Sequence, residues 1–335
     1  MARVAVINAS PEVYNLACDR IRAFHLARKD EVLDRLRPML DQVEKVYFSV
    51  IFTWDIPALI DQVLQAISPG VEIEIGGPAA TFMAKHIENR TGIIPHRGLD
   101  QRFEYQQPPE GESYQLTFTS RGCPHKCKFC GVFRAEGNSL NTYDVYPLAP
   151  MVGDNNILAT SWEHQKMVVA RYREWGKEVD FNSGFDVRYF QPRHYKLYSQ
   201  LRLLCWRFAF DTMKVEKDVK RVARLMMRHG LDRHQVTFYC LVGFPGTTPE
   251  EALRRIRTII ELGMNPYPMR FWPLNSLKRD YVAPGWTQDL LDKITLYYQT
   301  PVYWRGSPRP DSPCLSFDDF KVRYVERAKE QGVLV

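Results

Sequence analysis

The stretch 120–132, SRGCPHKCKFCGV, holds three of the seven cysteines of this 335-residue chain. Cys123, Cys127 and Cys130 follow a Cys-x3-Cys-x2-Cys spacing, and no fourth cysteine stands near them in the sequence. In a reducing cytosol, clustered thiols are more often metal ligands than disulfides. The spacing therefore predicts a metal centre with three protein thiolates.

Zinc and iron are the two metals to weigh for this loop. A structural zinc site is almost always closed by four protein ligands, and the fourth would have to be His125 or a distant thiol such as Cys205. Three thiolates can instead hold three irons of a [4Fe–4S] cluster and leave the fourth iron without a protein ligand. Because no second Cys-x2-Cys or His pair completes a zinc site, the loop favours the open cluster.

Strand and helix patterns alternate from the loop towards the C-terminus. The stretch 114–120, rich in β-branched and aromatic residues, runs straight into the loop. Further strands are expected within 149–154, 179–190, 205–211, 236–244 and 267–274. Helices are expected at 162–175, around 216–229 and at 248–263. Repeated β-α units of this length predict a parallel barrel or partial barrel, with reactive groups at the carboxyl ends of its strands.

Two of these helices carry recognisable end signals. Ser161 is positioned to cap the helix 162–175, and Gly176 follows its last residue. At the later helix, Thr248 precedes Pro249 at the first helical position, and Glu251 stands where a capping box needs it. The boundaries of both helices are therefore predicted as well as their existence.

The first hundred residues predict a small domain of their own. Strand-like runs at 3–8, 45–54 and 71–77 alternate with helical patterns at 16–30 and 56–67. The order β-α-β-α-β favours an open parallel sheet. We expect a Rossmann-like domain over 1–100, a polar linker over 101–112, a partial barrel over 113–275 and a C-terminal segment over 276–335. That last segment would contact substrate or cover the barrel, and we expect substrate contacts in the aromatic stretches 267–281 and 296–306 in particular.

Composition is that of an ordinary globular protein, with 45% apolar and 25% charged residues. The net charge of +6 suits an anionic partner without establishing one. The apolar run at the N-terminus is too short for a signal peptide. The longest uncharged stretch, 235–249, contains glycines and two prolines, which argues against a membrane span. We expect a cytoplasmic protein with no membrane partner.

The cysteine motif, with Phe129 just before its last cysteine and a strand before it, resembles the radical S-adenosylmethionine (SAM) superfamily. The resemblance implies a partial (β/α) barrel and two cofactors, a [4Fe–4S] cluster on Cys123, Cys127 and Cys130, and SAM near Phe129. It also implies reductive cleavage of SAM to methionine and a 5′-deoxyadenosyl radical that abstracts hydrogen from a substrate. An electron donor such as flavodoxin or ferredoxin is implied as a partner.

Other positions match the family less closely. The second strand of the family usually ends in Gly-Gly-Glu, and VGDNN stands here, so Asp154 and Asn155 would contact SAM. Arg188 and Asp211 stand near later strand ends and are candidate contacts of cofactor or substrate. The stretch YCLVGFPGTTPEE resembles the segment that packs on adenine, with Gly243 permitting close approach. For the charged residues, the alternative is an ordinary salt bridge.

The remaining cysteines and one histidine are expected to be structural. Cys205 and Cys240 fall in apolar strand patterns, where cysteine behaves as a small hydrophobe, and Cys314 falls in a loop. We expect three isolated thiols, not a second cluster. His25 falls in a helix and is expected to be a packed or surface histidine.

The N-terminal runs VYFSVIFTW and VEIEIGGPAAT resemble the cobalamin-binding domain that precedes the barrel in one branch of the superfamily. That branch often carries Asp-x-His-x-x-Gly, whose histidine can ligate cobalt, and this motif is absent from the sequence. The expectation is a shortened, degenerate domain that covers the barrel mouth. Cobalamin is a possible cofactor but not the favoured one.

Three functions follow from these patterns. The first is a radical SAM enzyme that uses the adenosyl radical directly, and the second is a cobalamin-dependent radical SAM methyltransferase. The third is a non-enzymatic, metal-stabilised nucleic-acid-binding module, suggested by the net charge and the basic helix near 214–234. An apolar stripe with a charged opposite face is, however, usual for a solvated helix. A small molecule, a modified nucleobase and a peptide all remain open as substrates.

Overall fold

The computed structural model describes residues 1–37 and 42–300 of the chain. It divides into two compact units, one formed by Met1–Ser183 with Trp272–Tyr281, the other, among the described residues, by Gly184–Phe271 with 282–300. Cys314 and the part of the expected C-terminal segment beyond residue 300 lie outside the described residues. The domain boundaries expected at residues 100, 112 and 275 stay predictions.

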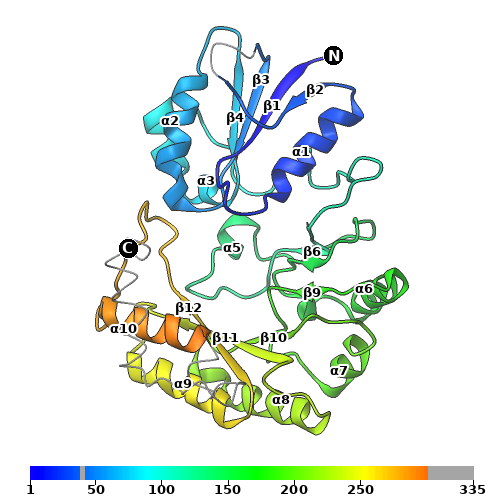
Figure 1. Cartoon of the computed structure of the whole chain (residues 1–335), viewed down its shortest axis with the longest axis vertical. Helices are drawn as coiled ribbons and strands as arrows, with labels where there is room; N and C mark the ends of the chain where they lie inside the picture. Colours follow the sequence, from blue (N-terminus) through cyan, green and yellow to red (C-terminus); the bar gives the residue numbers. More distant parts are fainter. Residues whose placement is uncertain (38–41, 301–335) are drawn as a thin grey trace, which may run out of the picture. The chain divides into compact units, whose positions relative to one another are not determined.

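A four-stranded parallel sheet opens the first unit, as the sequence predicts (Figure 1). Its strands are β1 (Arg3–Asn8), β2 (Glu31–Leu33), β3 (Lys45–Ser49) and β4 (Glu72–Gly76), in the order β2-β1-β3-β4. The short edge strand β2 was not expected from the sequence. Three of the six residues of β1 and four of the five of β3 are buried, because helices cover both faces of a parallel sheet.

Helices complete this part of the first unit. They are α1 (Leu16–Ala27), α2 (Ile56–Ala66), α3 (Pro78–Phe82) and α4 (Ala84–Thr91), and a 3₁₀ turn, η1 (Thr53–Asp55), leads into α2. Asn15 caps α1 by accepting a hydrogen bond from the backbone N–H of Cys18. The buried residues of α2 recur at helical spacing and enter a core with β1, β3 and β4. The two predicted helices are confirmed within a few residues.

The rest of the first unit carries the cysteine loop. Its parallel sheet has the order β5-β8-β9, from Leu116–Thr117, Met151–Val152 and Asp180–Phe181. An antiparallel pair, β6 (Ser120–Arg121) and β7 (Asn141–Thr142), lies before and after α5 (Val132–Ala135). A 3₁₀ turn, η2 (Ile157–Ala159), precedes α6 (Trp162–Trp175), which has the predicted Ser161 and Gly176 caps. These strands are much shorter than the patterns suggested.

The second unit has its own three-stranded parallel sheet, ordered β10-β11-β12. The strands are Trp206–Ala209, Val236–Val242 and Asn265–Arg270. Its helices are α7 (Pro192–Tyr198), α8 (Glu216–Arg228), α9 (Pro249–Glu261) and α10 (Gln288–Asp292), with turns η3 (Met213–Val215) and η4 (Lys293–Tyr297). Thr248 caps α9 as predicted, by accepting from the N–H of Glu251.

Parallel sheets alternating with helices confirm the predicted α/β class. Closure of β5-β8-β9 and β10-β11-β12 into one partial barrel stays a prediction, because the two sheets belong to different units. Among residues 1–37 and 42–300, none of the helices has the length and apolar character needed to cross a bilayer.

Candidate functional site

The cysteine loop begins at a residue that only glycine can occupy. Gly122, directly after β6, has φ of +82°, and a Cβ there would lie 2.1 Å from the backbone oxygen of Ser139. Within the loop the N–H of Cys130 donates to the carbonyl of Cys127 at 2.9 Å. The N–H of Val132, at the start of α5, donates to Cys130 Sγ at 3.5 Å. The backbone thus fixes both ends of the loop.

Cys123, Cys127 and Cys130 are all half-buried. Burial raises the pKa of the Cys130 thiol, and the N–H of Val132 opposes that rise. Charge on the two other loop cysteines adds to it, as expected for sulfurs that share one small region. In the described part of the chain, no three His, Cys, Asp or Glu side chains are arranged so that they could hold one metal ion. Phe129, between the last two thiols, is also half-buried.

Glu136, six residues after the last cysteine, contacts the start of the cysteine loop. Its Oε2 accepts hydrogen bonds from the backbone N–H of Gly122 at 3.0 Å and from Asn155 Nδ2 at 2.7 Å. Its Oε1 pairs with Arg121 Nη1 at 3.2 Å. One carboxylate therefore joins the beginning of the loop to the segment that follows it, and Asn155 contacts that carboxylate.

A chain of buried charges continues from Glu136. Arg121 Nε donates to Glu104 at 2.9 Å, and Arg20 Nη1 lies 2.7 Å from the other oxygen of Glu104. The Arg121 guanidinium also lies over the ring of Phe118, 3.4 Å from its centroid. The four side chains are between 5% and 13% exposed and carry two charges of each sign. Such a network is stable only while every member keeps its partner.

Asp154 lies at the end of β8, where the sequence placed it, and its carboxylate is fully engaged. It is 3% exposed and accepts four hydrogen bonds, from the backbone N–H and hydroxyl groups of Thr119 and Ser120, at 2.5 to 3.1 Å. The Thr119 hydroxyl is also 3.1 Å from His164 Nε2. Burial raises the pKa of Asp154, and the hydrogen bonds oppose that rise. Its observed contacts fasten β8 to the segment before the cysteine loop.

The predicted residues of the second unit also have local partners. Arg188 pairs with Asp186, Nη2 to Oδ2 at 2.6 Å. Asp211, just after β10, accepts from the N–H of Leu241 at 2.8 Å, and burial raises its pKa. At Gly243 a Cβ would lie 2.7 Å from Leu291, so the close approach there is made by that side chain. Their roles towards cofactor or substrate stay predictions.

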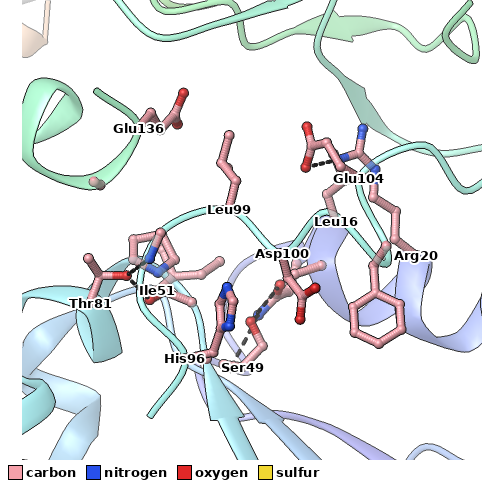
Figure 2. Close-up of a pocket in the computed structure, with 18 of the residues that line it drawn as sticks. Leu16, Arg20, Ser49, Ile51, Thr81, His96, Leu99, Asp100, Glu104 and Glu136 are labelled. Carbon is pink, nitrogen blue, oxygen red and sulfur yellow. Dashed lines mark hydrogen bonds and ion pairs between the residues drawn. The ribbon is translucent and has the colours of Figure 1, made fainter. Parts of the chain in front are cut away.

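A cavity of about 510 Å³ opens at the carboxyl ends of β3 and β4 in the first unit. That is within the roughly 300–1,000 Å³ typical of small-molecule sites. Figure 2 shows side chains of the first unit around it, among them Ser49 at the end of β3, Thr81 on α3 and His96; Glu136, directly after α5, also lines the cavity. Arg20 and Glu104 lie on its wall too. Ligands of open parallel sheets bind at this edge.

Glycines let the cavity walls approach closely. Gly77 has φ of +100°, and a Cβ would lie 2.4 Å from the carbonyl oxygen of Val50. At Gly131, directly after the last cysteine, a Cβ would lie 2.5 Å from the ring of Phe82 and 2.8 Å from Leu274. The cavity and the cysteine loop therefore share a wall at Gly131.

The aromatic stretch singled out in the sequence contributes one residue to this cavity, Leu274. Its neighbour Trp272 packs edge-on against Trp54 with ring centroids 6.4 Å apart. The Arg279 guanidinium lies 5.0 Å from the ring centroid of Trp54 and 5.5 Å from that of Trp272. The part of this stretch in the first unit thus combines packing with a place on the cavity wall.

Comparison with solved structures shows a shared fold. TsrM, a radical SAM methyltransferase from Kitasatospora setae, solved with cobalamin and a [4Fe-4S] cluster bound, matches at a TM-score of 0.60 and 13% identity, over 82% of this chain and 77% of that chain. TsrM with its tryptophan substrate and the SAM analogue aza-SAM bound also matches at 0.60, with 12% identity, over 80% and 73% of the two chains. The chain therefore shares the fold of TsrM.

Comparison of sequences, unlike comparison of structures, finds no match: no family model and no curated protein matches this chain. At 12 to 13% identity, the likeness to TsrM shows the fold and leaves the activity to be argued from the site. The radical SAM fold agrees with the resemblance that the cysteine motif carries.

Structure adds three residues that the sequence did not single out, namely Glu136, Glu104 and Arg20. Their carboxylates and guanidinium meet only through folding, since Arg20 lies on α1 and Glu104 in the expected linker. The position of Glu136, six residues after the last cysteine, is too weak a signal to stand out by itself. His25 is confirmed as a packed histidine, with its ring nitrogens near Asp30 and the Tyr47 hydroxyl.

Proposed function

We propose that this chain is a radical SAM enzyme with a [4Fe–4S] cluster on Cys123, Cys127 and Cys130. The observation that carries the proposal is the half-buried three-thiol loop, closed by Gly122 and Glu136 next to a short parallel sheet. The similar fold of TsrM, whose structure contains such a cluster, supports it.

The donor set fits an iron–sulfur cluster better than a zinc ion. Three soft sulfur donors on eight residues suit iron–sulfur ligation, and a closed zinc site would need a fourth protein ligand. Bound to the open iron, SAM would accept one electron from the cluster and yield methionine and a 5′-deoxyadenosyl radical. Cys130 is the thiol whose sulfur already accepts a backbone N–H, the kind of contact that steadies a ligand.

The chain's own residues would orient the cluster and shield it from water. Gly122 and Glu136 define the start of the loop, and the Phe82 and Leu274 side chains close against Gly131 at its end. Asp154 fastens the segment before the loop to β8. A direct contact of Asp154 with SAM belongs to the proposal, and it requires the carboxylate to exchange a present partner for the methionine amine.

Anaerobic reaction with dithionite and SAM tests this function. The reconstituted protein should convert SAM to 5′-deoxyadenosine and methionine, slowly without substrate and faster with it, as read by mass spectrometry of the quenched mixture. The electron donor in the cell would be a flavodoxin or ferredoxin. A fully loaded, reducible protein that leaves SAM intact would contradict the proposal.

Methyl transfer with cobalamin is the second candidate, and the cavity beside the N-terminal sheet favours it. The place of the cavity at the carboxyl edge of the sheet, and the close approach of the chain at Gly77 and Gly131, suit the flat corrin ring of such a cofactor. TsrM, with the same fold, was solved with cobalamin bound. The strand ends at Ser49 and Gly76 would line the cofactor, which would supply the methyl-transfer chemistry. The expectation that the N-terminal domain does not hold cobalamin is therefore weaker than the expectation that it does.

Filling the cavity separates the two candidates. A Cβ at Gly76 meets no atom within 4 Å, so Gly76→Phe adds bulk in open space. Protein purified from cobalamin-supplemented cells should carry corrinoid, and Gly76→Phe should lower its affinity at least about tenfold while iron loading stays. Leu64→Phe, on the exposed side of α2, is the control. Wild-type protein without corrinoid, making only 5′-deoxyadenosine, would leave hydrogen abstraction as the function; S-adenosylhomocysteine as main product would establish methyl transfer.

A nucleic-acid-binding role is not proposed. The basic helix that suggested it is α8, and its apolar residues Val219, Val222, Ala223 and Met226 are fully buried in the second unit. Its charged face is then that of an ordinary solvated helix.

A further inference from the structure

The carboxylate of Glu136 is placed to do more than stabilise the fold. It is 13% exposed at the side chain, lies on the cavity wall and touches the residue directly before the first cysteine. We propose that Glu136 is the positioning residue of the cysteine loop and that its charge sets the reduction potential of the cluster held there. This inference rests on the proposed function.

The first argument is geometric. Glu136 Oε2 accepts the N–H of Gly122, and the backbone N–H of Glu136 itself donates to Val132. The carboxylate therefore links the two ends of the segment that contains all three thiols. Asn155 Nδ2, 2.7 Å from the same oxygen, fixes the carboxylate from the end of β8. A ligand loop tied across its base holds its donors in place when the ligand binds.

The second argument is electrostatic. The Glu136 carboxylate accepts the N–H of Gly122, the residue bonded to Cys123, so its negative charge acts close to the loop sulfurs. A negative charge near an iron–sulfur cluster disfavours the reduced, more negative state and lowers the reduction potential. Arg121 offsets part of this charge, and Arg121 is itself shared with Glu104. Replacing Glu136 by glutamine should therefore raise the potential.

The third argument is that the other buried carboxylate near the loop has a different task. Asp154 accepts its four hydrogen bonds from Thr119 and Ser120, which lie before the loop. Glu136 contacts Gly122 directly. Of the two, Glu136 is the one whose loss should act on the cluster rather than on the sheet.

The experiment compares Glu136→Gln and Glu136→Ala with wild type after anaerobic reconstitution of the full chain. Glu163→Gln is the matched control, because Glu163 forms only an exposed ion pair with Lys166 on α6. Four quantities are measured: iron per chain, the rate of iron loss to a chelator, the midpoint potential by electron paramagnetic resonance without SAM, and the melting temperature.

Glu136→Gln keeps an oxygen for the Gly122 N–H and should fold and load iron like wild type. Its potential should rise, because the negative charge is removed. Glu136→Ala also loses the acceptor of the Gly122 N–H and should lose iron about tenfold faster than wild type, the lower end of the effect of removing a partner of a metal-ligand shell. A fall in melting temperature with unchanged potential and chelation rate in Glu136→Gln would show a purely structural role and overturn the inference, even if Glu136→Ala fails to fold.

The wild-type and cysteine variants separate this inference from the function beneath it. Wild-type protein that binds no iron, or binds it equally after Cys127→Ala, would overturn the proposed function and the inference with it. Full, thiol-dependent iron in wild type, with identical behaviour of Glu136→Gln and Glu163→Gln, would overturn the inference alone.

Discussion

The cysteine loop and the N-terminal cavity lie against each other in the first unit, yet they are built by different means. The loop is one short segment whose shape depends on a glycine, three backbone contacts and a carboxylate. The cavity draws its walls from strand ends, helices and loops between Tyr14 and Leu274. A metal site needs few donors in fixed positions, whereas a cofactor cavity needs volume. Substitutions of the loop cysteines should therefore abolish metal binding, whereas substitutions in the cavity wall should lower ligand affinity by degrees.

The buried charges between the two regions belong to both. Arg121 and Glu136 contact the start of the loop, while Arg20 and Glu104 stand on the cavity wall. Their network is the part of the molecule where a change in one region reaches the other. The contrast between the cysteine loop and the cavity can be tested at the loop cysteines, in the network of buried charges and at Asp154.

The largest effect is expected at the thiols. Replacing Cys123, Cys127 or Cys130 by alanine should abolish iron binding, because two thiolates cannot hold the cluster in place. Anaerobic reconstitution followed by iron analysis measures it, with about four irons per wild-type chain expected. Cys18→Ala is the control, since burial raises the pKa of Cys18 to about 12 and keeps it a thiol. Cys314→Ala should also leave the cluster. Unchanged iron in Cys127→Ala would refute the assignment.

Next comes the network itself. Glu104→Ala would leave Arg20 and Arg121 buried without their shared partner. Breaking a buried pair in this way costs about 3–5 kcal/mol of unfolding free energy, and urea denaturation measures it. Glu112→Ala removes an exposed pair with Arg22 and should cost under about 1 kcal/mol. Equal losses of unfolding free energy in Glu104→Ala and Glu112→Ala would show that the buried network of charged side chains adds no stability beyond that of an exposed pair.

Much of the fold could be predicted from the sequence because its signals are local. The helix caps at Ser161 and Thr248, the strands 3–8 and 236–242 and the three loop cysteines all depend on residues close in sequence. The short strands β5, β8 and β9 were overestimated, since buried apolar residues such as Val187 and Phe190 also lie outside strands.

The site could be predicted only in part, for the same reason. Arg20 and Glu104 are 84 positions apart, and only the folded chain brings them within 2.7 Å. The strand pattern predicted Asp154 at a strand end but not its four donors, which come from Thr119 and Ser120 in the segment before the cysteine loop. Contacts between segments that are distant in the sequence leave no periodicity or residue spacing from which they could be predicted.

A smaller effect is expected at Asp154. Asp154→Ala should leave iron loading intact and weaken SAM binding, as the family position implies. The same change deprives the buried N–H groups of Thr119 and Ser120 of their acceptor, which costs about 1–3 kcal/mol for each group left unpaired. Isothermal titration with SAM and urea denaturation separate the two effects. Reduced stability with unchanged SAM affinity would assign Asp154 to the fold alone.

The smallest effect is a pH dependence of stability from Glu104. Burial alone would raise the pKa of its carboxyl, but the guanidiniums of Arg121 and Arg20 outweigh burial and lower it. Because the folded pKa lies below the unfolded value of about 4.3, the contribution is fully present above that pH and is lost as pH falls through the folded pKa. Urea midpoints of wild type should therefore decline between about pH 5 and pH 3 more steeply than those of Glu104→Gln. Glu112→Gln, at the exposed pair, should decline nearly as wild type does. Parallel curves for wild type and Glu104→Gln would mean that the two arginines do not favour the charged carboxylate, and the network between loop and cavity would then be held by packing instead of charge.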